Sequence, residues 1–241
     1  MSQDAAELVY VKTFWDRPPI ADEGDKEQRT IYEAVGEALS NWEEVDQELA
    51  DLFLIFTCEA GTRDGPGRLV RNAVRRAYGS IISNVGRRLA IEAAAEVYFV
   101  PWWGNKAVSA PLIKLLEAVG WASKRRDDIA HGIVDRPSTM EVYDAYGVLQ
   151  TSQQHGSFLM PPEYKTDRTY AYPKNLDHPA GMRRARYAYN SAQIRDFTWR
   201  FQALKSAIQK YSRRVEKTED GTIPLVREVG ADTRRASKPS S

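Results

Sequence analysis

The chain has 241 residues, 28% of them charged, and a formal net charge of only +1. This length suits one ordinary domain with a sizeable core. The near-neutral balance excludes a basic field over the whole surface, so any nucleic-acid binding must come from a local patch. The one cysteine, Cys58, excludes an intramolecular disulfide and a cysteine-rich zinc site. No secretory leader pattern or apolar run of membrane-spanning length is present, so we expect a cytoplasmic protein without a membrane partner.

Residues 1–25 combine a short β-prone piece with Pro18-Pro19 and an acidic run, which predicts a poorly ordered or edge-packed segment. From 26 to 60, apolar residues recur on alternating steps of three and four, which places them on one face of a helix. These residues are Val35, Ala38, Trp42, Val45, Leu49, Leu52 and Phe56. We expect one long amphipathic helix, or two nearly collinear ones, ended by the glycine-rich stretch 61–67.

A second long helix is expected from 69 to 99, with Val70, Val74, Ala77, Ile81, Val85 and Leu89 facing inward. Arginines are frequent in this segment, at Arg68, Arg71, Arg75, Arg76, Arg87 and Arg88. They either bind phosphate groups or pair with the acidic first helix, and we favour the pairing. A third helix is expected to carry Pro111 in its first turn and to end near Gly132.

Residues 133–190 hold five of the twelve prolines and seven of the twelve tyrosines, and no helical period persists in them. Short β-prone pieces at 140–143, 157–160 and 186–189 predict an irregular insertion with one or two hairpins. Basic residues alternate here with tyrosines, among them Tyr187 and Tyr189. This arrangement either presents a surface to RNA or packs tyrosines across strands, and we favour the packing.

The last helix is predicted over 190–216, because Asn190 and Gln193 have the spacing of a capping box. Seven apolar residues keep a strict three-four spacing after it: Ile194, Phe197, Phe201, Leu204, Ile208, Tyr211 and Val215. The polar residues 217–241 are expected to form a disordered tail. The segments predict an all-α fold: a four-helix up-and-down bundle over 26–216, with an irregular, partly β insertion at 133–190 before the last helix.

The stretch 123–132 places charges of both signs beside a histidine at a predicted helix end. In a regular helix Asp127 lies one turn before His131 on the same side, so its carboxylate can hold the imidazole. Arg126 occupies the apolar seam and points about 140° away from His131 around the axis. One helix therefore does not bring Arg126 and His131 together. Either Arg126 reaches across, or a second helix or a second copy of the chain completes the site.

A simpler explanation of this stretch needs no site. A run of lysine, arginine and aspartate is often a solvated helix face, and an aspartate one turn from a histidine is often a local surface pair. The sequence contains no Gly-rich phosphate loop, no GxSxG motif and no zinc-protease motif. The enzyme classes that depend on those motifs are therefore not supported.

The helical parts of the chain, 26–132 and 190–216, resemble the HEPN superfamily. Those helical bundles carry an arginine, then four to six residues, then a histidine at the end of the third long helix. The stretch from Arg126 to His131 fits the four-residue gap, and Arg125 fits the five-residue gap. The residue after the arginine is typically polar in that family, often Asn, and here it is Asp127.

The resemblance implies a metal-independent endoribonuclease without a cofactor, acting on RNA as a homodimer through attack of the ribose 2′-hydroxyl on its phosphate. It implies His131 as the general base or acid and Arg126 as the group that neutralises charge on the phosphate. Asp127 would orient the imidazole, and Arg125 and Lys124 would add charge for RNA binding. A toxin or defence role would fit such an enzyme, with an antitoxin or a regulatory protein as partner.

The resemblance also allows a non-catalytic binding or adaptor module, because inactive HEPN-like bundles exist. The carboxylates of Asp127 and Asp128 repel an RNA phosphate unless Arg125 and Arg126 outweigh them. A plain structural role for the helical bundle is the third alternative.

Overall fold

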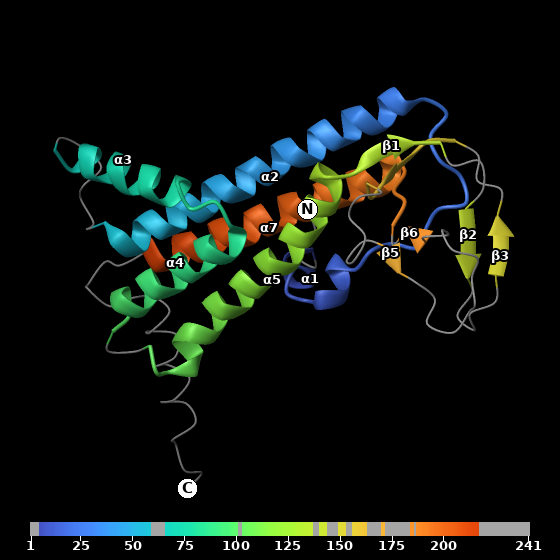
Figure 1. The fold of residues 1–241 in the computed structure, drawn as a ribbon. Helices are drawn as coiled ribbons and strands as arrows, with labels where there is room; N and C mark the ends of the chain where they lie inside the picture. Colours follow the sequence, from blue (N-terminus) through green and yellow to red (C-terminus); the bar gives the residue numbers. More distant parts are fainter. Residues whose placement is uncertain are drawn as a thin grey trace, which may run out of the picture. The chain divides into compact units, whose positions relative to one another are not determined.

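The computed structural model describes residues 5–58, 66–100, 103–136, 140–143, 149–152, 156–162, 170–171, 184–185 and 187–216. Within these ranges the chain is mostly helical (Figure 1). The helices are α1 (Ala5–Leu8), the short 3₁₀ helix η1 (Lys12–Trp15), α2 (Gln28–Thr57), α3 (Pro66–Gly79), α4 (Asn84–Tyr98), α5 (Lys106–Ala130) and α7 (Ser191–Glu216). The predicted fold class, a helical bundle with a partly β insertion before the last helix, is confirmed.

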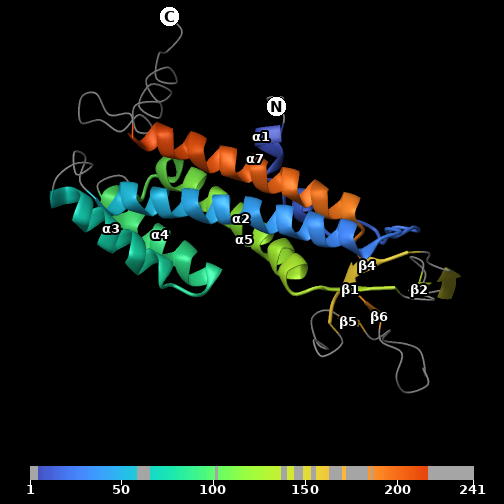
Figure 2. The same ribbon diagram turned by 90° about the horizontal axis from the view of Figure 1, so that it is seen from above.

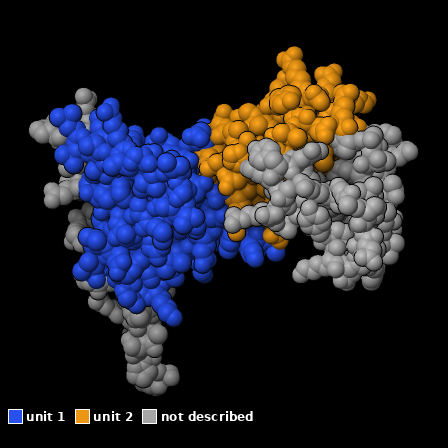
Figure 3. All heavy atoms as spheres, in the orientation of Figure 1, with its two compact units in different colours: residues 1–14, 43–123, 202–241 blue, residues 15–42, 124–201 orange. Residues whose placement is uncertain are grey.

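The chain divides into two compact units, each assembled from separated segments (Figure 3). Unit 1 comprises 1–14, 43–123 and 202–241, and unit 2 comprises 15–42 and 124–201. The long helices α2, α5 and α7 supply residues to both units. The charged stretch at the end of α5 therefore belongs to unit 2, with the segment before α2 and the insertion.

In unit 1, α3 and α4 lie beside the second half of α2 (Figures 1 and 2). Arg75 of α3 forms an ion pair with Asp51. Arg87 of α4 donates to the Asp46 carboxylate at 2.8 Å. For these two arginines the expected pairing with the acidic first helix is confirmed.

The single helix predicted over 69–99 is wrong, because the chain turns between α3 and α4. Ser83 caps α4: its side-chain oxygen accepts the Gly86 amide at 3.0 Å, which satisfies a backbone donor that has no partner within the helix. Arg87 holds the turn by donating to the Ile81 carbonyl at 2.9 Å. A capping serine thus separates two helices where the apolar period alone predicted one.

The break also changes which side chains are buried. Three residues predicted to face inward are more than half exposed: Val70, Val85 and Leu89. The buried positions are instead Tyr78 of α3 and Ile91 and Ala95 of α4. Each short helix presents its own face to the core, so one continuous period over both of them does not describe the packing.

Pro111 lies deeper in α5 than predicted, because the helix already begins at Lys106. Asn105 precedes this start, and its side-chain oxygen accepts the Ala107 amide at 3.0 Å. A proline inside the helix lacks the amide hydrogen that would complete a backbone hydrogen bond. The cap at Asn105, rather than the proline, therefore defines where α5 begins.

The prediction for α7 is confirmed in detail. The Asn190 amide donates to the Gln193 side-chain oxygen at 3.2 Å, and the Gln193 amide donates to the Asn190 side-chain oxygen at 3.0 Å. This reciprocal pair is a capping box. All seven apolar residues predicted for the inner face of this helix are buried.

The insertion contains three antiparallel strand pairs among its described residues. They are β1 (Ile133–Asp135) with β4 (Phe158–Met160), β2 (Met140–Tyr143) with β3 (Leu149–Ser152), and β5 (Tyr170–Ala171) with β6 (Arg184–Ala185). An isolated bridge joins Leu159 to Tyr189, so β4 also lies beside the chain that leads into α7. The predicted tail at 217–241 lies outside the described residues.

Part of the segment predicted as poorly ordered or edge-packed makes defined contacts within unit 2. Trp15 is buried, and its ring stacks on Phe201 with centroids 6.1 Å apart. The Asp25 carboxylate accepts the Ser191 amide at 2.7 Å and the Ser191 hydroxyl at 2.6 Å. The lead-in to α2 is thus joined to the start of α7.

Two glycines allow the packing of this lead-in to be tested. Gly156 has a φ of +112°, and a Cβ built there would lie 2.6 Å from the Gly24 backbone. Gly156→Ala is expected to lower the free energy of unfolding by about 1–3 kcal/mol from the backbone conformation alone. Urea denaturation monitored by circular dichroism measures this change.

Gly36→Ala is the matched control. This glycine lies inside α2 and is exposed, and nothing lies within 4 Å of a Cβ added to it. The same substitution should raise the free energy of unfolding there by about 0.5–1 kcal/mol. Equal effects at the two glycines would contradict the close approach of Gly156 to Gly24.

Candidate functional site

The charged stretch 123–132 covers about the last two turns of α5 and the two residues after it. The helix ends at Ala130, and the His131 amide still donates to the Asp127 carbonyl at 3.1 Å. β1 begins two residues later, at Ile133. His131 is therefore positioned by backbone geometry where the helix passes into the insertion, as predicted.

Gly132 follows the helix for a different reason from the one expected. It does not adopt the left-handed conformation that usually explains a glycine after a helix. Instead, a Cβ on Gly132 would lie 2.6 Å from the Leu159 side chain and 3.1 Å from the Asp128 carbonyl. The glycine thus allows β4 to approach the end of α5.

Burial alternates along this stretch. Arg125, Asp128 and Ile129 are buried, whereas Lys124, Asp127 and His131 are exposed. Arg126 is intermediate, with 25% of its side chain exposed. The directions of successive side chains differ by about 100° around a helix axis. The stretch therefore places one set of charges in the interior of unit 2 and another at its surface.

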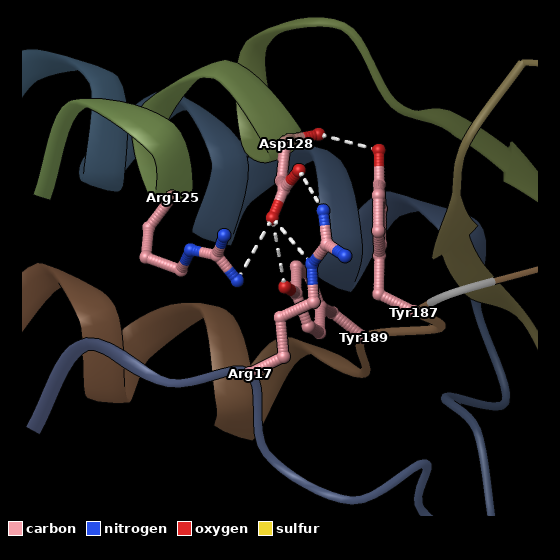
Figure 4. A network of polar contacts seen from close by, with 5 residues as sticks. All are labelled: Arg17, Arg125, Asp128, Tyr187 and Tyr189. Atoms are coloured by element: carbon pink, nitrogen blue, oxygen red, sulfur yellow. Dashed lines mark hydrogen bonds and ion pairs between the residues drawn. The ribbon is translucent and has the colours of Figure 1, made fainter. Parts of the chain in front are cut away.

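The buried set is centred on the Asp128 carboxylate (Figure 4). Arg17 donates to both of its oxygens, at 3.0 and 2.9 Å. Arg125 lies 3.2 Å from one of these oxygens, which also accepts the Tyr189 hydroxyl at 3.2 Å. The Tyr187 hydroxyl donates to the Asp128 carbonyl at 3.0 Å. We call these five residues the Asp128 network.

The two tyrosines complete the network with their rings. Tyr187 and Tyr189 stack with centroids 4.8 Å apart, and the Arg17 guanidinium lies 5.1 Å above the Tyr187 ring. Burial, and then the Asp128 carboxylate, raise the pKa of the Tyr189 hydroxyl. Tyr189 therefore remains a neutral donor to Asp128. Of the two alternatives for these tyrosines, the less favoured one, a surface facing RNA, is wrong, because both are buried.

Sequence reasoning missed Arg17. It lies in a segment without a helical or strand period, and it contacts Asp128, which is 111 residues further along the chain. One available signal was the alternation of Tyr187 and Tyr189, because alternate residues of an extended chain point to the same side. Two hydroxyls on one side suggest a buried polar acceptor, but nothing in the sequence identifies Asp128 as that acceptor.

Two contacts within unit 2 hold the Arg126 side chain. Its Nη1 lies 3.0 Å from the Asp127 carboxylate, and its guanidinium lies 5.5 Å above the Trp42 ring. Its Nε is buried and has no hydrogen-bond partner in the described part of the chain. The structure thus brings Arg126 into contact with Asp127 and with the ring of the buried Trp42.

His131 is not joined to either of them by its side chain. Within the described residues, its imidazole makes no hydrogen bond or ion pair with Asp127 or Arg126. The expected side-chain contact between Asp127 and His131 is therefore not formed in the single chain. Of the two residues expected to add charge for RNA, Lys124 is exposed, while the guanidinium of Arg125 faces Asp128.

The described residues contain no cluster of three or more His, Cys, Asp or Glu that could hold a metal ion. None of the helices in the described ranges combines the length and apolar character that a membrane span requires.

Comparisons of the chain with protein-family models, with curated proteins and with solved structures found no match. The resemblance to the HEPN superfamily therefore depends on the motif, because the break between α3 and α4 makes α5 the fourth helix counted from α2 rather than the third.

The two adjacent aspartates offer a test of the Asp128 network. In Asp128→Asn, the guanidiniums of Arg17 and Arg125 lose their buried counter-charge, and a new amide donor faces them. Breaking a buried ion pair in this way typically costs about 3–5 kcal/mol. We expect a loss of this size in the free energy of unfolding, measured by urea denaturation.

Asp127→Asn removes the same charge from an exposed position, where ion pairs contribute at most about 1 kcal/mol. We expect its free energy of unfolding to stay within about 0.5 kcal/mol of the wild type. A similar result for Asn at both positions would show that the Asp128 network does not stabilise the fold.

Proposed function

We propose that the end of α5 is the catalytic surface of a metal-independent endoribonuclease. The observation that carries the proposal is how the charged side chains at the end of α5 are distributed between the interior and the surface. The buried Arg125 and Asp128 belong to the Asp128 network, while Arg126, Asp127 and His131 remain at or near the surface. Functional groups perform best when rigid neighbours hold them, and the network supplies that support.

The proposed reaction begins with attack of the ribose 2′-hydroxyl oxygen on the adjacent phosphorus. The bond from phosphorus to the 5′-oxygen breaks, which leaves a 2′,3′-cyclic phosphate and a 5′-hydroxyl. His131 takes the proton from the 2′-hydroxyl or gives a proton to the leaving oxygen. Arg126 neutralises the charge that develops on the phosphate oxygens, a task that suits the forked donors of guanidinium.

Asp127 receives a role that differs from the one first expected. Its carboxylate contacts Arg126 rather than His131, so in the proposed enzyme it positions the guanidinium over Trp42 until RNA binds. The exposed imidazole must then meet an arginine from elsewhere. A second copy of the chain can supply that arginine, because a symmetric dimer brings two equivalent turns together. The active species we propose is therefore a homodimer.

The alternative is a non-catalytic binding or adaptor module, and one observation favours it. Arg126 is already engaged by Asp127 and by the Trp42 ring, and three quarters of its side chain is covered. A guanidinium held in this way suits a fixed structural contact as well as a phosphate contact. Cleavage of RNA is the property that distinguishes the two functions.

The proposed enzyme should cleave single-stranded RNA in the presence of EDTA and leave products with cyclic phosphate ends. His131→Ala and Arg126→Ala should each reduce cleavage by at least about 100-fold, because each removes a group that acts on the reacting atoms. A fluorescent RNA strand resolved on denaturing gels measures this activity. His155→Ala, at a histidine without an arginine at the family spacing, is the control and should keep full activity.

Mixing the two inactive variants tests the dimer. If Arg126 of one protomer works with His131 of the other, a mixed dimer of Arg126→Ala and His131→Ala contains one complete site. Cleavage should then return after the two proteins are unfolded and refolded together. RNA that survives with the wild-type protein at high concentration would instead support the adaptor function.

A further inference from the structure

Two neighbouring hollows lie along the second half of α7 in unit 1. One, of about 300 Å³, is lined by Glu48, Asp51, Ile55, Arg71, Gln209, Ser212 and Arg213. The other, of about 410 Å³, is lined by Ser206, Gln209, Lys210, Arg213 and Arg214. Gln209 and Arg213 line both hollows, and we call the two hollows together the α7 groove.

The α7 groove contains four cationic side chains, those of Arg71, Lys210, Arg213 and Arg214. In the described part of the chain, none of the four forms an ion pair, and the three on α7 are exposed. Residues three and four apart share one helix face, so Lys210, Arg213 and Arg214 point to the same side within about 6 Å along the axis.

The two carboxylates of the groove are already engaged by other partners. Glu48 accepts the Gln209 side-chain amide at 2.6 Å. Asp51 accepts the Gln47 side-chain amide at 3.2 Å and pairs with Arg75. Arg75 offsets the charge of Asp51, whereas the neutral Gln209 amide leaves the charge of Glu48 in place. The four cations of the groove still outnumber its two carboxylates.

The Tyr10 ring lies near one of these cations, Arg214. Tyr10 is 38% exposed, and burial raises the pKa of its hydroxyl against a smaller opposing effect of the Arg214 guanidinium. The groove therefore joins unpaired cations, hydrogen-bonding side chains such as Ser206, and a ring on which a base can stack. Apart from Ile55, the lining offers no aliphatic side chain for a lipid surface, which needs an apolar face.

We infer that the α7 groove binds the phosphate backbone of a single-stranded nucleic acid. The overall charge of +1 gives no general attraction for a polyanion, so the contacts must be local. A flexible single strand can follow a short groove and stack a base on Tyr10, which is how such strands are commonly held. The inference concerns binding alone and does not require the end of α5 to be catalytic.

A deoxyribonucleotide strand tests the inference separately from cleavage, because it lacks the 2′-hydroxyl that the proposed ribonuclease needs. Fluorescence anisotropy of a labelled strand of about 12 nucleotides measures binding to the full chain between about 50 and 200 mM salt. We expect the logarithm of the binding constant to fall against the logarithm of salt with a slope of about −2 to −3, for three or four phosphate contacts.

Single substitutions in the groove should each remove one of those contacts. Arg71→Gln, Lys210→Gln, Arg213→Gln and Arg214→Gln should each weaken binding and reduce the salt slope by about 0.7. Arg29→Gln is the matched control, because Arg29 is an exposed arginine of unit 2 that pairs with Glu33. That variant loses the same charge and should bind the strand as the wild type does.

Four results would overturn the inference. The first is that the strand fails to bind at 50 mM salt, and the second is that Arg29→Gln weakens binding as much as the groove variants do. The third is that inorganic phosphate at millimolar concentration displaces the strand and the salt slope is near −0.7, which would indicate a site for one phosphate. The fourth is that the groove variants weaken binding of anionic phospholipid vesicles but not of the strand, which would indicate a membrane surface. Loss of RNA cleavage in His131→Ala with normal strand binding leaves the inference intact.

Discussion

The Asp128 carboxylate is the constraint on which unit 2 depends. A buried carboxylate is costly unless donors surround it, and here the donors come from three separate parts of the chain. Arg17 belongs to the segment before α2, Arg125 to α5 itself and Tyr189 to the residues before α7. If any one of these segments moves away, the buried Asp128 carboxylate loses a donor. The network therefore makes the end of α5 one of the most strongly determined parts of unit 2.

This burial also changes the electrostatics of the neighbouring surface. Two adjacent aspartates beside a candidate phosphate site suggest repulsion, but Asp128 is neutralised inside by two guanidiniums. Only Asp127 remains exposed, and it contacts Arg126. The surface of the turn thus presents Lys124 and His131 beside a local ion pair. Repulsion of a phosphate is much weaker than the sequence alone suggests.

The sequence predicts structure best where local rules agree with packing. In α7 the capping box and an unbroken apolar period point to the same helix, and both are observed. Between α3 and α4 they disagree, since the apolar period continues while Ser83 caps a new helix. The Asp128 network lies beyond such rules, because the contact of Arg17 with Asp128 depends on tertiary packing rather than on spacing. The position of the motif was therefore predictable, whereas its internal support was not.

The aspartate at 127, where the HEPN superfamily that the motif resembles often has asparagine, need not prevent phosphate binding. An ion pair at an exposed position contributes at most about 1 kcal/mol, because water and salt screen both charges. A phosphate oxygen pair offers guanidinium two parallel hydrogen bonds, which are stronger than the single contact to Asp127. In the proposed enzyme, RNA would therefore displace Asp127 from Arg126 at small cost. The Trp42 ring would continue to hold the guanidinium during that exchange, since a cation above a ring face is attracted without a hydrogen bond.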